Sequence, residues 1–497
     1  MFKKPKIIIL LALLVVFFFA FRLAKLTLIP VFCDEAIYIR WSQVMRAEPT
    51  LRFLPLSDGK QPLFMWLTIP FLKIFSDPLF AGRFLSVLTG FLSLVGIFLL
   101  ALRLFKSFKI AFFSALFYTV VPYAFFFDRM ALVDGFLSAL GIWILYFGIL
   151  LVEYQRLDLA MITGMVLGAA LITKSPAIFF AALLPVCLII RLNEFKKSPF
   201  QLIKMGGLFL VVYFFAFAIY NSLRLGASFH MIAIRNRDYI FSLQEVLQHP
   251  WDPFQFHIRE IGEWFGSLLT WPIFLGAIGG IVLGVKNKRI LLLFFWCLIP
   301  LIIQSFFAKV FTARYLLFAV PPLLIISAWF WEKILKKPLF FILLLLWPIW
   351  FDYLLLTNPQ KTSLPKRERL GYFEEWTAGY GIKEIADYAR EKAKEKNVVI
   401  ATEGFFGTLP DGLQIYLNHA PGITVFGTGQ VDVFQITDSI KNAAQENLAY
   451  FVVNESRMKA KDDPNLKLIK EFPKAVRSDG TREKLLFYEV LFNPNND

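Results

Sequence analysis

Charged residues and cysteines are both scarce in this chain of 497 residues. Only 18% of the residues are charged, against roughly 25% in an average soluble domain. The three cysteines, Cys33, Cys187 and Cys297, are too few and too far apart for a disulfide framework or a zinc site. In contrast, 57% of the residues are hydrophobic and 57 are phenylalanine. This composition excludes an ordinary soluble enzyme and a disordered chain, and it predicts a polytopic membrane protein.

Acidic residues are scarce in one part of the chain only. The first 360 residues hold 33 Lys and Arg against 17 Asp and Glu, whereas the remainder holds 19 against 20. The basic excess lies in short loops between hydrophobic runs, which is the positive-inside pattern of membrane proteins and argues against a nucleic-acid partner. A nucleotide fingerprint is also missing, because Gly427 and Gly429 are followed by Asp432 where a third glycine is needed.

Eleven apolar runs predict membrane-spanning helices. The first follows three lysines and no small-residue cleavage site comes after it, so we expect a retained helix with a cytoplasmic amino end. The eleven runs are Ile7–Ile29, Leu79–Leu102, Ile110–Phe127, Ala131–Val152, Leu159–Thr173, Ser175–Ile190, Met205–Ser222, Trp264–Val285, Ile290–Phe307, Tyr315–Trp331 and Leu339–Thr357. If the chain crosses the membrane eleven times from a cytoplasmic amino end, the segments that lie inside hold 17 basic and 4 acidic residues. The basic residues include Lys106, Lys196, Lys288 and Lys336.

The predicted architecture is a mainly helical membrane domain over residues 1–356 and a soluble α/β domain over 357–497. The membrane domain is expected in the plasma membrane, with long outer loops at 30–78 and 223–263, and the C-terminal domain outside the cytoplasm. In the first loop, Asp34–Ala47 predicts a short helix and Pro62–Phe75 an interfacial segment. The C-terminal domain is predicted from mixed helix and strand patterns: Gly381–Lys396, Asn397–Thr402, Leu413–Leu417, Ile423–Phe426, Thr437–Asn447 and Ala449–Val453.

Two clusters of the first outer loop are candidates for chemistry. Asp34 and Glu35 are adjacent carboxylates beside apolar sequence, and such a group serves as a general base if it faces a cleft. The alternative is an ordinary helix start, with Asp34 as the N-cap. Lys60 follows an Asp-Gly turn and can hold a phosphate, or it can anchor to lipid headgroups as many interfacial lysines do.

Further charged residues fall on the same predicted face. Asp128 and Arg129 occupy a short connection, and Asp134 lies about one turn into the next helix, where a lone acid indicates either a functional site or a salt bridge. Lys174, and Arg314 with its neighbour Tyr315, lie at outer helix ends, and Arg235, Arg237 and Arg259 lie in the second outer loop together with His230, His249 and His257. Those histidines match no ligand spacing, so no cofactor is indicated and a divalent metal is left open.

At these residues the sequence resembles the protein O-mannosyltransferases and the bacterial lipid A aminoarabinose transferases. The resemblance covers roughly residues 1–331. Its carriers are Asp34-Glu35 with Tyr38, Gly59-Lys60-Gln61-Pro62-Leu63, Arg129-Met130-Ala131-Leu132-Val133-Asp134, Lys174-Ser175-Pro176, and Ala313-Arg314-Tyr315 with Pro321-Pro322. It implies a polytopic C-type glycosyltransferase fold and a sugar donor carried on a polyprenyl phosphate.

The resemblance also implies roles for single residues. Asp34 takes a proton from the acceptor hydroxyl, and inversion at the anomeric carbon releases the polyprenyl phosphate. Glu35, the second catalytic candidate, is assigned a supporting role towards a cation or ligand. Lys60, Arg129 and Arg314 bind the donor phosphate, with Asp128, Asp134, Lys174 and Tyr315 in support. Gly59 stands where some relatives carry an acid or a proline, so a metal site using that acid is not carried over. The expected partners are membrane lipid, the lipid-linked donor and a glycan, lipid or protein acceptor.

A transporter or flippase of lipid-linked sugars is the alternative function. It has the same apolar bulk and buried charges. Against it, the charges gather on one predicted face, and no inverted repeat is visible in the sequence. An acyltransferase or a receptor does not account for the pairing of Asp34 with Lys60. The sequence therefore favours a hexosyl or pentosyl transferase, without indicating the sugar.

Overall fold

The computed structural model describes residues 5–195, 197–335, 339–460 and 463–491 and divides into two compact units. The membrane unit consists of Met1–Ala24, Thr50–Leu67 and Arg83–Pro365. The sheet unit consists of Lys25–Pro49, Thr68–Gly82 and Lys366–Asp497. Parts of the first outer loop, predicted from the sequence to belong to the membrane domain, are thus grouped with the C-terminal sheet. Lys196 and Lys336 of the predicted inner segments lie outside the described residues.

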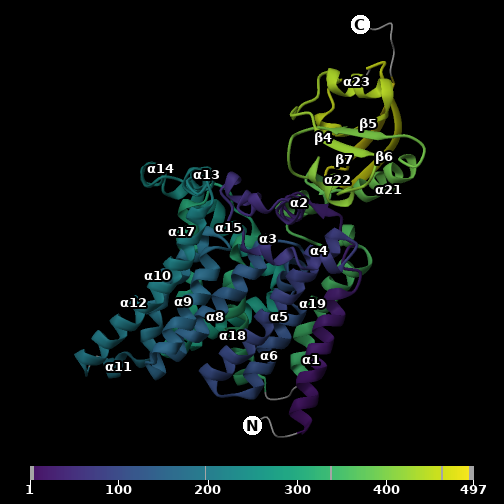
Figure 1. Cartoon of the computed structure of the whole chain (residues 1–497). Coiled ribbons are helices and arrows are strands. Elements are labelled where there is room, and N and C mark those ends of the chain that lie inside the picture. Colours follow the sequence, from purple (N-terminus) through teal and green to yellow (C-terminus); the bar gives the residue numbers. More distant parts are fainter. Residues whose placement is uncertain (1–4, 196, 336–338, 461–462, 492–497) are drawn as a thin grey trace. The chain divides into compact units, whose positions relative to one another are not determined.

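Among the described residues, seven helical stretches are long and apolar enough to cross a membrane. They form a multi-pass, mainly helical bundle (Figure 1). The seven are α1 (Pro5–Leu23), α5 (Pro78–Phe105), α8 (Val133–Tyr154), the broken stretch Ser175–Phe195 that contains α10 (Ile178–Leu183) and α11 (Leu192–Phe195), Pro199–Leu225 that contains α12 (Pro199–Asn221), α17 (Lys288–Phe307), and Ala313–Ile334 that contains α18 (Val320–Ile334).

The other four predicted spans form shorter or bent helices. An eighth crossing is formed if α15 (Trp251–Leu268) and α16 (Trp271–Leu283) count as one, although the two are bent by 118° at a break where Thr270 has a φ of 66°. The remaining three are α6 (Phe108–Val120), α9 (Leu157–Leu171) and α19 (Leu339–Thr357). Each predicted apolar run therefore forms a helix, but the described residues contain seven or eight spans by length, not eleven.

The bends and short helices have causes in the sequence. Pro122 opens α7 (Pro122–Phe127) directly after α6, and proline lacks the N–H that would continue the helix. Thr270 precedes Pro272, which stands at the start of α16 in the same way. A proline within an apolar run thus divides the run into two helices, whereas hydropathy alone predicts a single span.

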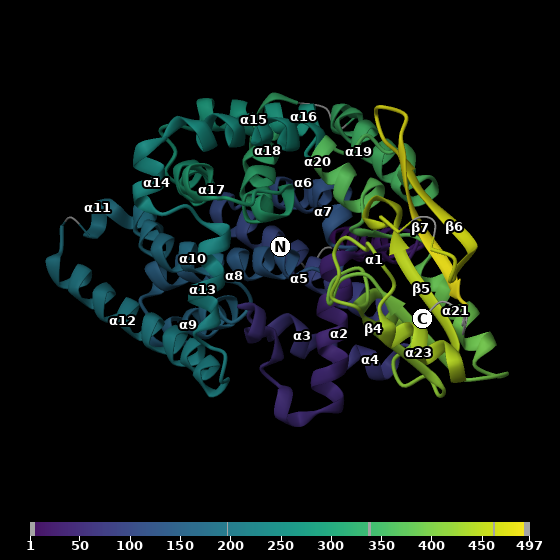
Figure 2. The ribbon, with the colours of Figure 1, turned by 90° about the horizontal axis from the view of Figure 1, so that it is seen from above.

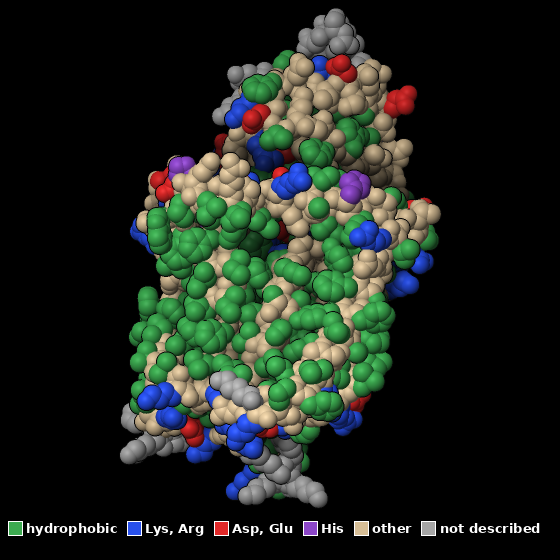
Figure 3. All heavy atoms as spheres, turned by 90° about the vertical axis from the view of Figure 1, so that its left-hand side faces the viewer, with side chains coloured by type: hydrophobic (Ala, Val, Ile, Leu, Met, Phe, Trp, Pro, Cys, Tyr) green, Lys and Arg blue, Asp and Glu red, His purple; other side chains and the backbone are tan. Residues whose placement is uncertain are grey.

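Apolar side chains cover the helical bundle and small residues let its helices approach. Figure 2 looks along the bundle and shows α12 beside α9 and α16 beside α18, pairs that also have extensive contacts. Gly164 of α9 lies against the backbone of Val212, where a Cβ would stand 2.6 Å from the carbonyl oxygen. Figure 3 shows hydrophobic side chains over the height of the bundle, with Lys and Arg below this hydrophobic region and also along its upper edge. This distribution is typical of a membrane-embedded surface.

The sheet unit contains one mixed five-stranded sheet in the order β4-β3-β5-β7-β6. Strands β3 (Val398–Thr402), β4 (Ile423–Gly427) and β5 (Leu448–Asn454) are parallel, and β6 (Leu466–Val476) and β7 (Arg482–Val490) complete the sheet antiparallel to their neighbours. The strand predicted at 397–402 is confirmed as β3, and the segments at 423–426 and 449–453, predicted only as part of a mixed helix and strand pattern, form β4 and β5. The helices are α21 (Ile382–Lys392), α22 (Asp411–Tyr416) and α23 (Asp438–Glu446), and α23 buries Ile440 in the core beneath β5.

The first outer loop supplies elements to both units. The helix expected at Asp34–Ala47 is α2 (Cys33–Ala47) in the sheet unit. The predicted interfacial segment forms two short helices, α3 (Leu63–Thr68) and α4 (Phe71–Ile74). In the second outer loop the structure has α13 (Met231–Tyr239) and α14 (Leu243–Gln248). The outer loops position Lys60 and Arg235, and the ends of the helices in the bundle position Asp134, Lys174 and Arg314.

Candidate active-site cavity

The membrane unit contains an open cavity of about 630 Å³. Its wall is mostly apolar, with Phe179, Phe217 and Phe307 among the lining side chains. The charged lining residues are Lys60, Asp134, Lys174 and Arg235. They come from segments far apart in the sequence: the turn before α3, the start of α8, the break after α9, and α13. A cavity with one charged region and an extended apolar wall suits an amphipathic ligand.

Asp134 is the centre of an ion-pair group at this cavity. Its Oδ1 accepts a hydrogen bond of 2.5 Å from Lys174 Nζ, and its Oδ2 lies 3.9 Å from Arg314 Nε. The Lys174 ammonium also stands 4.0 Å from the centre of the Tyr315 ring. Burial lowers the pKa of Lys174, while the Asp134 carboxylate opposes that shift. One carboxylate between two cations leaves this group with a net positive charge.

Lys60 is held by a residue of the second outer loop. Its Nζ donates a hydrogen bond of 2.8 Å to the hydroxyl of Tyr239 and lies 4.3 Å from the centre of that ring. Beside it, Gln61 Nε2 donates to Ser175 Oγ at 2.8 Å, which joins the turn to the break that carries Lys174. The neutral phenol orients the ammonium without cancelling its charge.

The turn that carries Lys60 is fastened to α13. Arg235 lies 2.9 Å from an oxygen of Asp58. Gly59 has a φ of 67°, and a Cβ at this position would stand 2.7 Å from the Cβ of Arg235 and 2.8 Å from the carbonyl oxygen of Met231. Glycine is therefore required both by the backbone conformation and by the close approach of α13. Beneath the turn, Leu56 and Ile232 are buried in a shared apolar cluster.

The end of α13 is tied to the end of α17. Ile240 pairs with Ala308 in an antiparallel bridge. The Phe241 N–H donates to the Phe307 carbonyl at 2.7 Å, and the Lys309 N–H donates to the Tyr239 carbonyl at 2.8 Å. The backbone of Tyr239 and of the two residues that follow it is thus fixed to the end of α17, which helps to keep the Tyr239 hydroxyl at Lys60.

Asp128 and Arg129 do not line this cavity but contact α1. Arg22 Nε donates to Asp128 Oδ2 at 2.8 Å, and Tyr118 donates to Asp128 Oδ1 at 2.9 Å. Arg129 Nη1 donates to the carbonyls of Arg22 and Ala24 at 2.9 and 2.8 Å. Because cations stabilise the carbonyl end of a helix, these contacts favour a structural role for Arg129. Phosphate binding by Arg129 stays a prediction.

Asp34 and Glu35 lie at the start of α2, in the sheet unit. Glu35 is fully buried, and its Oε2 accepts a hydrogen bond of 3.0 Å from the N–H of Phe32. Phe32, and not Asp34, is the N-cap residue of α2. Asp34 is partly exposed. The sequence alternative of a helix start therefore describes Glu35, and Asp34 is the carboxylate of the pair that keeps access to solvent. Their catalytic roles stay predictions.

Sequence analysis identified all four charged residues that line the cavity, but it missed Tyr239 and the polar contact of Gln61. Outside the cavity it missed Arg22, the partner of Asp128. Tyr239 follows Arg235 by four positions, and this helical spacing was the available signal for a shared face. Of the three loop histidines, His257 is buried and contacts the Ser305 carbonyl through Nδ1 at 2.9 Å. Within the described residues, no group of three or more His, Cys, Asp and Glu side chains is arranged to hold a metal ion.

Comparisons with known proteins agree with the sequence motifs. Residues 59–220 match the family model of dolichyl-phosphate-mannose-protein mannosyltransferase. Crystal structures of ArnT from Cupriavidus metallidurans, in the apo state and bound to undecaprenyl phosphate, align with TM-scores of 0.60 and 0.62 at 15% and 16% identity. The alignments cover 99% and 98% of this chain, and the same shares of the two ArnT chains.

A more distant likeness is that to the Archaeoglobus fulgidus oligosaccharyltransferase complex with zinc and sulfate. It has a TM-score of 0.51 at 12% identity and covers 98% of this chain and 74% of that chain. No curated protein sequence matches the chain significantly. At these identities the structural likenesses show the fold. The family match over residues 59–220 confirms the resemblance to the dolichyl-phosphate-mannose-protein mannosyltransferases, and the structural alignments confirm the resemblance to ArnT in fold.

Proposed function

We propose that the chain is an inverting membrane glycosyltransferase. It moves a sugar from a polyprenyl-phosphate donor to a hydroxyl group of a glycan, lipid or protein acceptor on the outer face. The observation that carries the proposal is the cavity, in which Lys60, Lys174 and Arg235 stand beside an extended apolar wall. A polyprenyl phosphate has the same two parts, an anionic headgroup and an apolar chain. The fold shared with ArnT bound to undecaprenyl phosphate supports the same donor class.

The cations stabilise the leaving group. As the bond between the anomeric carbon and the phosphate oxygen breaks, its electron pair remains on the phosphate and the negative charge of the leaving group grows. Lys60 and Arg314 are assigned to that phosphate, with Lys174 held near them by Asp134. A preorganised cation in a water-poor cavity is most effective where charge develops in the transition state.

Asp34 is assigned as the general base. The acceptor oxygen forms a bond to the anomeric carbon from the face opposite the phosphate, and the hydroxyl proton passes to the Asp34 carboxylate. A sugar or lipid hydroxyl is a weak nucleophile at neutral pH, so removal of its proton in the transition state lowers the barrier. Glu35 supports Asp34 by capping the helix that carries it.

The test is a transfer assay with purified protein and a panel of polyprenyl-phosphate sugars, followed by release of polyprenyl phosphate. In single-turnover reactions we expect Asp34→Asn to lose ~10²–10⁴-fold in rate while donor binding is retained. Lys60→Ala is expected to lose ~10²-fold. Lys286→Ala, which changes an exposed lysine of the α16–α17 connection, serves as the control and is expected to match the wild type.

Two outcomes contradict the proposal. If the protein binds the donors but never releases polyprenyl phosphate, and liposomes that contain it equilibrate the lipid between leaflets, the transporter alternative is correct. If Asp34→Asn and Glu35→Gln both transfer sugar at the wild-type rate, the base is another group and the assigned mechanism fails.

A further inference from the structure

The helix that carries Asp34 is anchored to the C-terminal part of the chain. In β1 (Val31–Phe32) and β2 (Ala378–Gly379), Val31 pairs with Gly379 and Phe32 with Ala378 in an antiparallel ladder. The Cys33 N–H continues this pairing and donates to the Thr377 carbonyl at 3.0 Å. Asp34 is the next residue. Its backbone position is therefore fixed on its amino side by hydrogen bonds to a segment of the C-terminal region.

Side chains anchor the same helix on its other side. α2 packs against α22, as Figure 1 shows. Arg40 uses its planar guanidinium to bridge two amides: Nε donates to Gln414 Oε1 at 3.1 Å, and Nη1 donates to Asn418 Oδ1 at 2.9 Å. Gln43 Nε2 donates to the Ile415 carbonyl at 2.8 Å. These contacts hold the helix about two turns beyond Asp34.

A buried acid lies next to this anchor. Asp411 opens α22 and accepts a hydrogen bond of 2.6 Å from the Gly407 N–H. Burial raises its pKa to about 6, against the opposing effect of the Arg40 charge. Gly407 itself lies close to the Cys33 side chain, since a Cβ at this glycine would stand 3.1 Å from the sulfur. The C-terminal segment thus surrounds the start of α2 as well as its middle.

We propose that the C-terminal α/β region positions the Asp34 carboxylate and that Arg40 is the positioning residue on α2. This inference rests on the proposed function, because Arg40 affects the reaction only if Asp34 is the general base. A general base must be held within about 0.5 Å of its productive place, and a misplacement of about 1 Å can cost roughly 10²-fold in rate. The fork geometry of arginine meets two acceptors at once, which lysine does not reproduce.

The test is a double-mutant cycle in the full-length protein. Arg40→Ala is expected to lower kcat by ~10–10²-fold while the KM for the donor changes by less than about 2-fold, because donor binding does not require the base. Arg40→Lys is expected to lose less than Arg40→Ala. In the Asp34→Asn background, Arg40→Ala is expected to add little, because its effect passes through the missing carboxylate.

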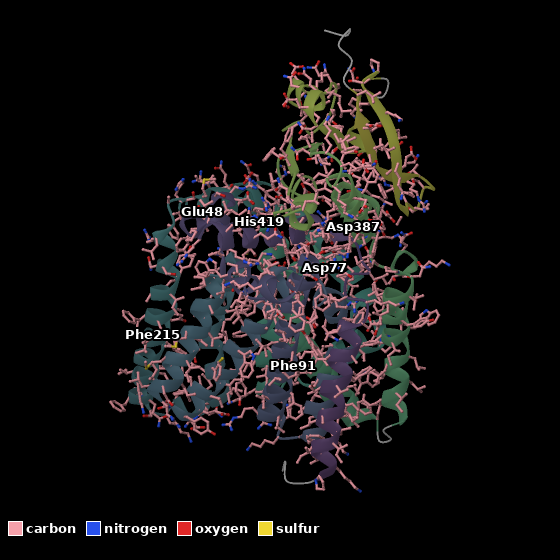
Figure 4. All side chains as sticks on the ribbon, turned by 45° about the vertical axis from the view of Figure 1, so that its right-hand side comes forward. Glu48, Asp77, Phe91, Phe215, Asp387 and His419 are labelled. Carbon is pink, nitrogen blue, oxygen red and sulfur yellow. The ribbon has the colours of Figure 1, made fainter. Side chains whose placement is uncertain are left out.

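The matched control removes another contact of the sheet unit that does not involve α2. Lys383 Nζ of α21 donates to Asp77 Oδ2 at 2.8 Å, and Figure 4 labels Asp77. Lys383→Ala is expected to leave kcat within about 2-fold, in line with the small effect of exposed ion pairs. If Arg40→Ala fails to fold, the Asn418→Ala variant, which removes one acceptor of the Arg40 guanidinium, takes its place in the cycle.

The outcomes separate the inference from the proposed function. Wild-type protein that transfers no sugar contradicts the proposed function. An active wild type with an inactive Asp34→Asn variant and a fully active Arg40→Ala variant overturns only the inference. The inference is also overturned if Arg40→Ala lowers the residual rate of Asp34→Asn by the same factor as in the wild type, because the loss is then independent of the base.

Discussion

At the scale of single residues, Asp134 is the one carboxylate that lines the cavity within the described chain. It holds Lys174 directly and Arg314 at a longer distance. Removing one partner of a buried ion pair leaves the other charge uncompensated, which costs more than the pair contributes. The acid therefore keeps the cations charged and in place without cancelling them.

Asp134→Asn is expected to make donor binding pH-dependent. Burial lowers the pKa of Lys174, and the negative charge of Asp134 opposes this shift. Because Asp134→Asn removes that charge, the pKa of Lys174 should fall further in the variant. Lys174 in the variant then loses its proton at a lower pH than in the wild type, so the affinity for polyprenyl phosphate falls as the pH rises, by ~10-fold if about 1.4 kcal/mol of charge interaction is lost. Binding isotherms measured over a series of pH values, with the wild type in parallel, test this.

The double variant Asp134→Asn/Lys174→Met is the control for that prediction. It removes both charges, so its binding should be weaker than that of the wild type at every pH but flat across the range. A single variant whose affinity is equally flat contradicts the role given to Asp134.

Tyr239→Phe is expected to weaken the hold on Lys60 without removing the ring. The lost hydroxyl accepts a hydrogen bond from an ammonium, an interaction worth about 1.5–3 kcal/mol, so kcat/KM should fall by ~10–10²-fold. Tyr220→Phe, which alters another tyrosine of the cavity wall, is the matched control and should retain the wild-type value. Equal losses in both variants indicate a general effect on the wall and not on Lys60. Kinetics over a range of donor concentrations separate kcat from KM.

At the scale of elements, α13 fixes the turn that presents Lys60. The turn is built from Asp58 and Gly59, and α13 contributes Arg235 and the carbonyl of Met231 at close range. Hydropathy does not show this contact, because the segment is polar on average and lies in a loop between spans. The contact depends on two outer loops that meet only when the bundle has formed.

Gly59→Ala is expected to disturb this contact. Gly59 has a left-handed backbone conformation that alanine disfavours, and the added Cβ would overlap Arg235 and Met231. The substitution should therefore lower the free energy of unfolding by about 1–3 kcal/mol, and the transfer rate should fall as well. Gly206→Ala in α12 is the control, because no atom lies within 4 Å of its added Cβ. Alanine favours a helix, so this control should be neutral or slightly stabilising. Thermal midpoints and transfer rates of both variants decide the prediction.

Whether an element could be predicted from the sequence depends on which interactions define that element. Long apolar runs predicted every span but also predicted spans where the described residues form shorter or bent helices. A short apolar run predicted β3, whereas the segments of β4 and β5 were predicted only as part of a mixed helix and strand pattern. The break at Thr270 was missed because the run is uniformly apolar and only Pro272 marked it. In the site, the charged residues were visible one by one. The partners Tyr239 and Arg22 were not, because their contacts depend on packing between segments more than 90 positions apart.

At the scale of the whole molecule, the orientation in the membrane stays a prediction from the charges. Introduced cysteines test it, since the three native cysteines are buried and should not label. We expect a membrane-impermeant probe on intact cells to label position 441 and not position 288, because loops rich in Lys and Arg remain inside. Position 441 lies in α23 and position 288 at the start of α17. Labelling at 288 but not at 441 contradicts the orientation.

The pairing of β1 with β2 also sets an order of events during synthesis. It joins segments roughly 350 positions apart, and a ribosome that adds ~5–20 residues per second needs about 17–70 s to make the intervening chain. Throughout that interval α2 and its carboxylate lack their C-terminal support. A half-finished chain that already contains the donor cavity is therefore expected to be inactive, so that completion of the polypeptide itself switches the enzyme on and incomplete chains leave the lipid-linked sugar intact.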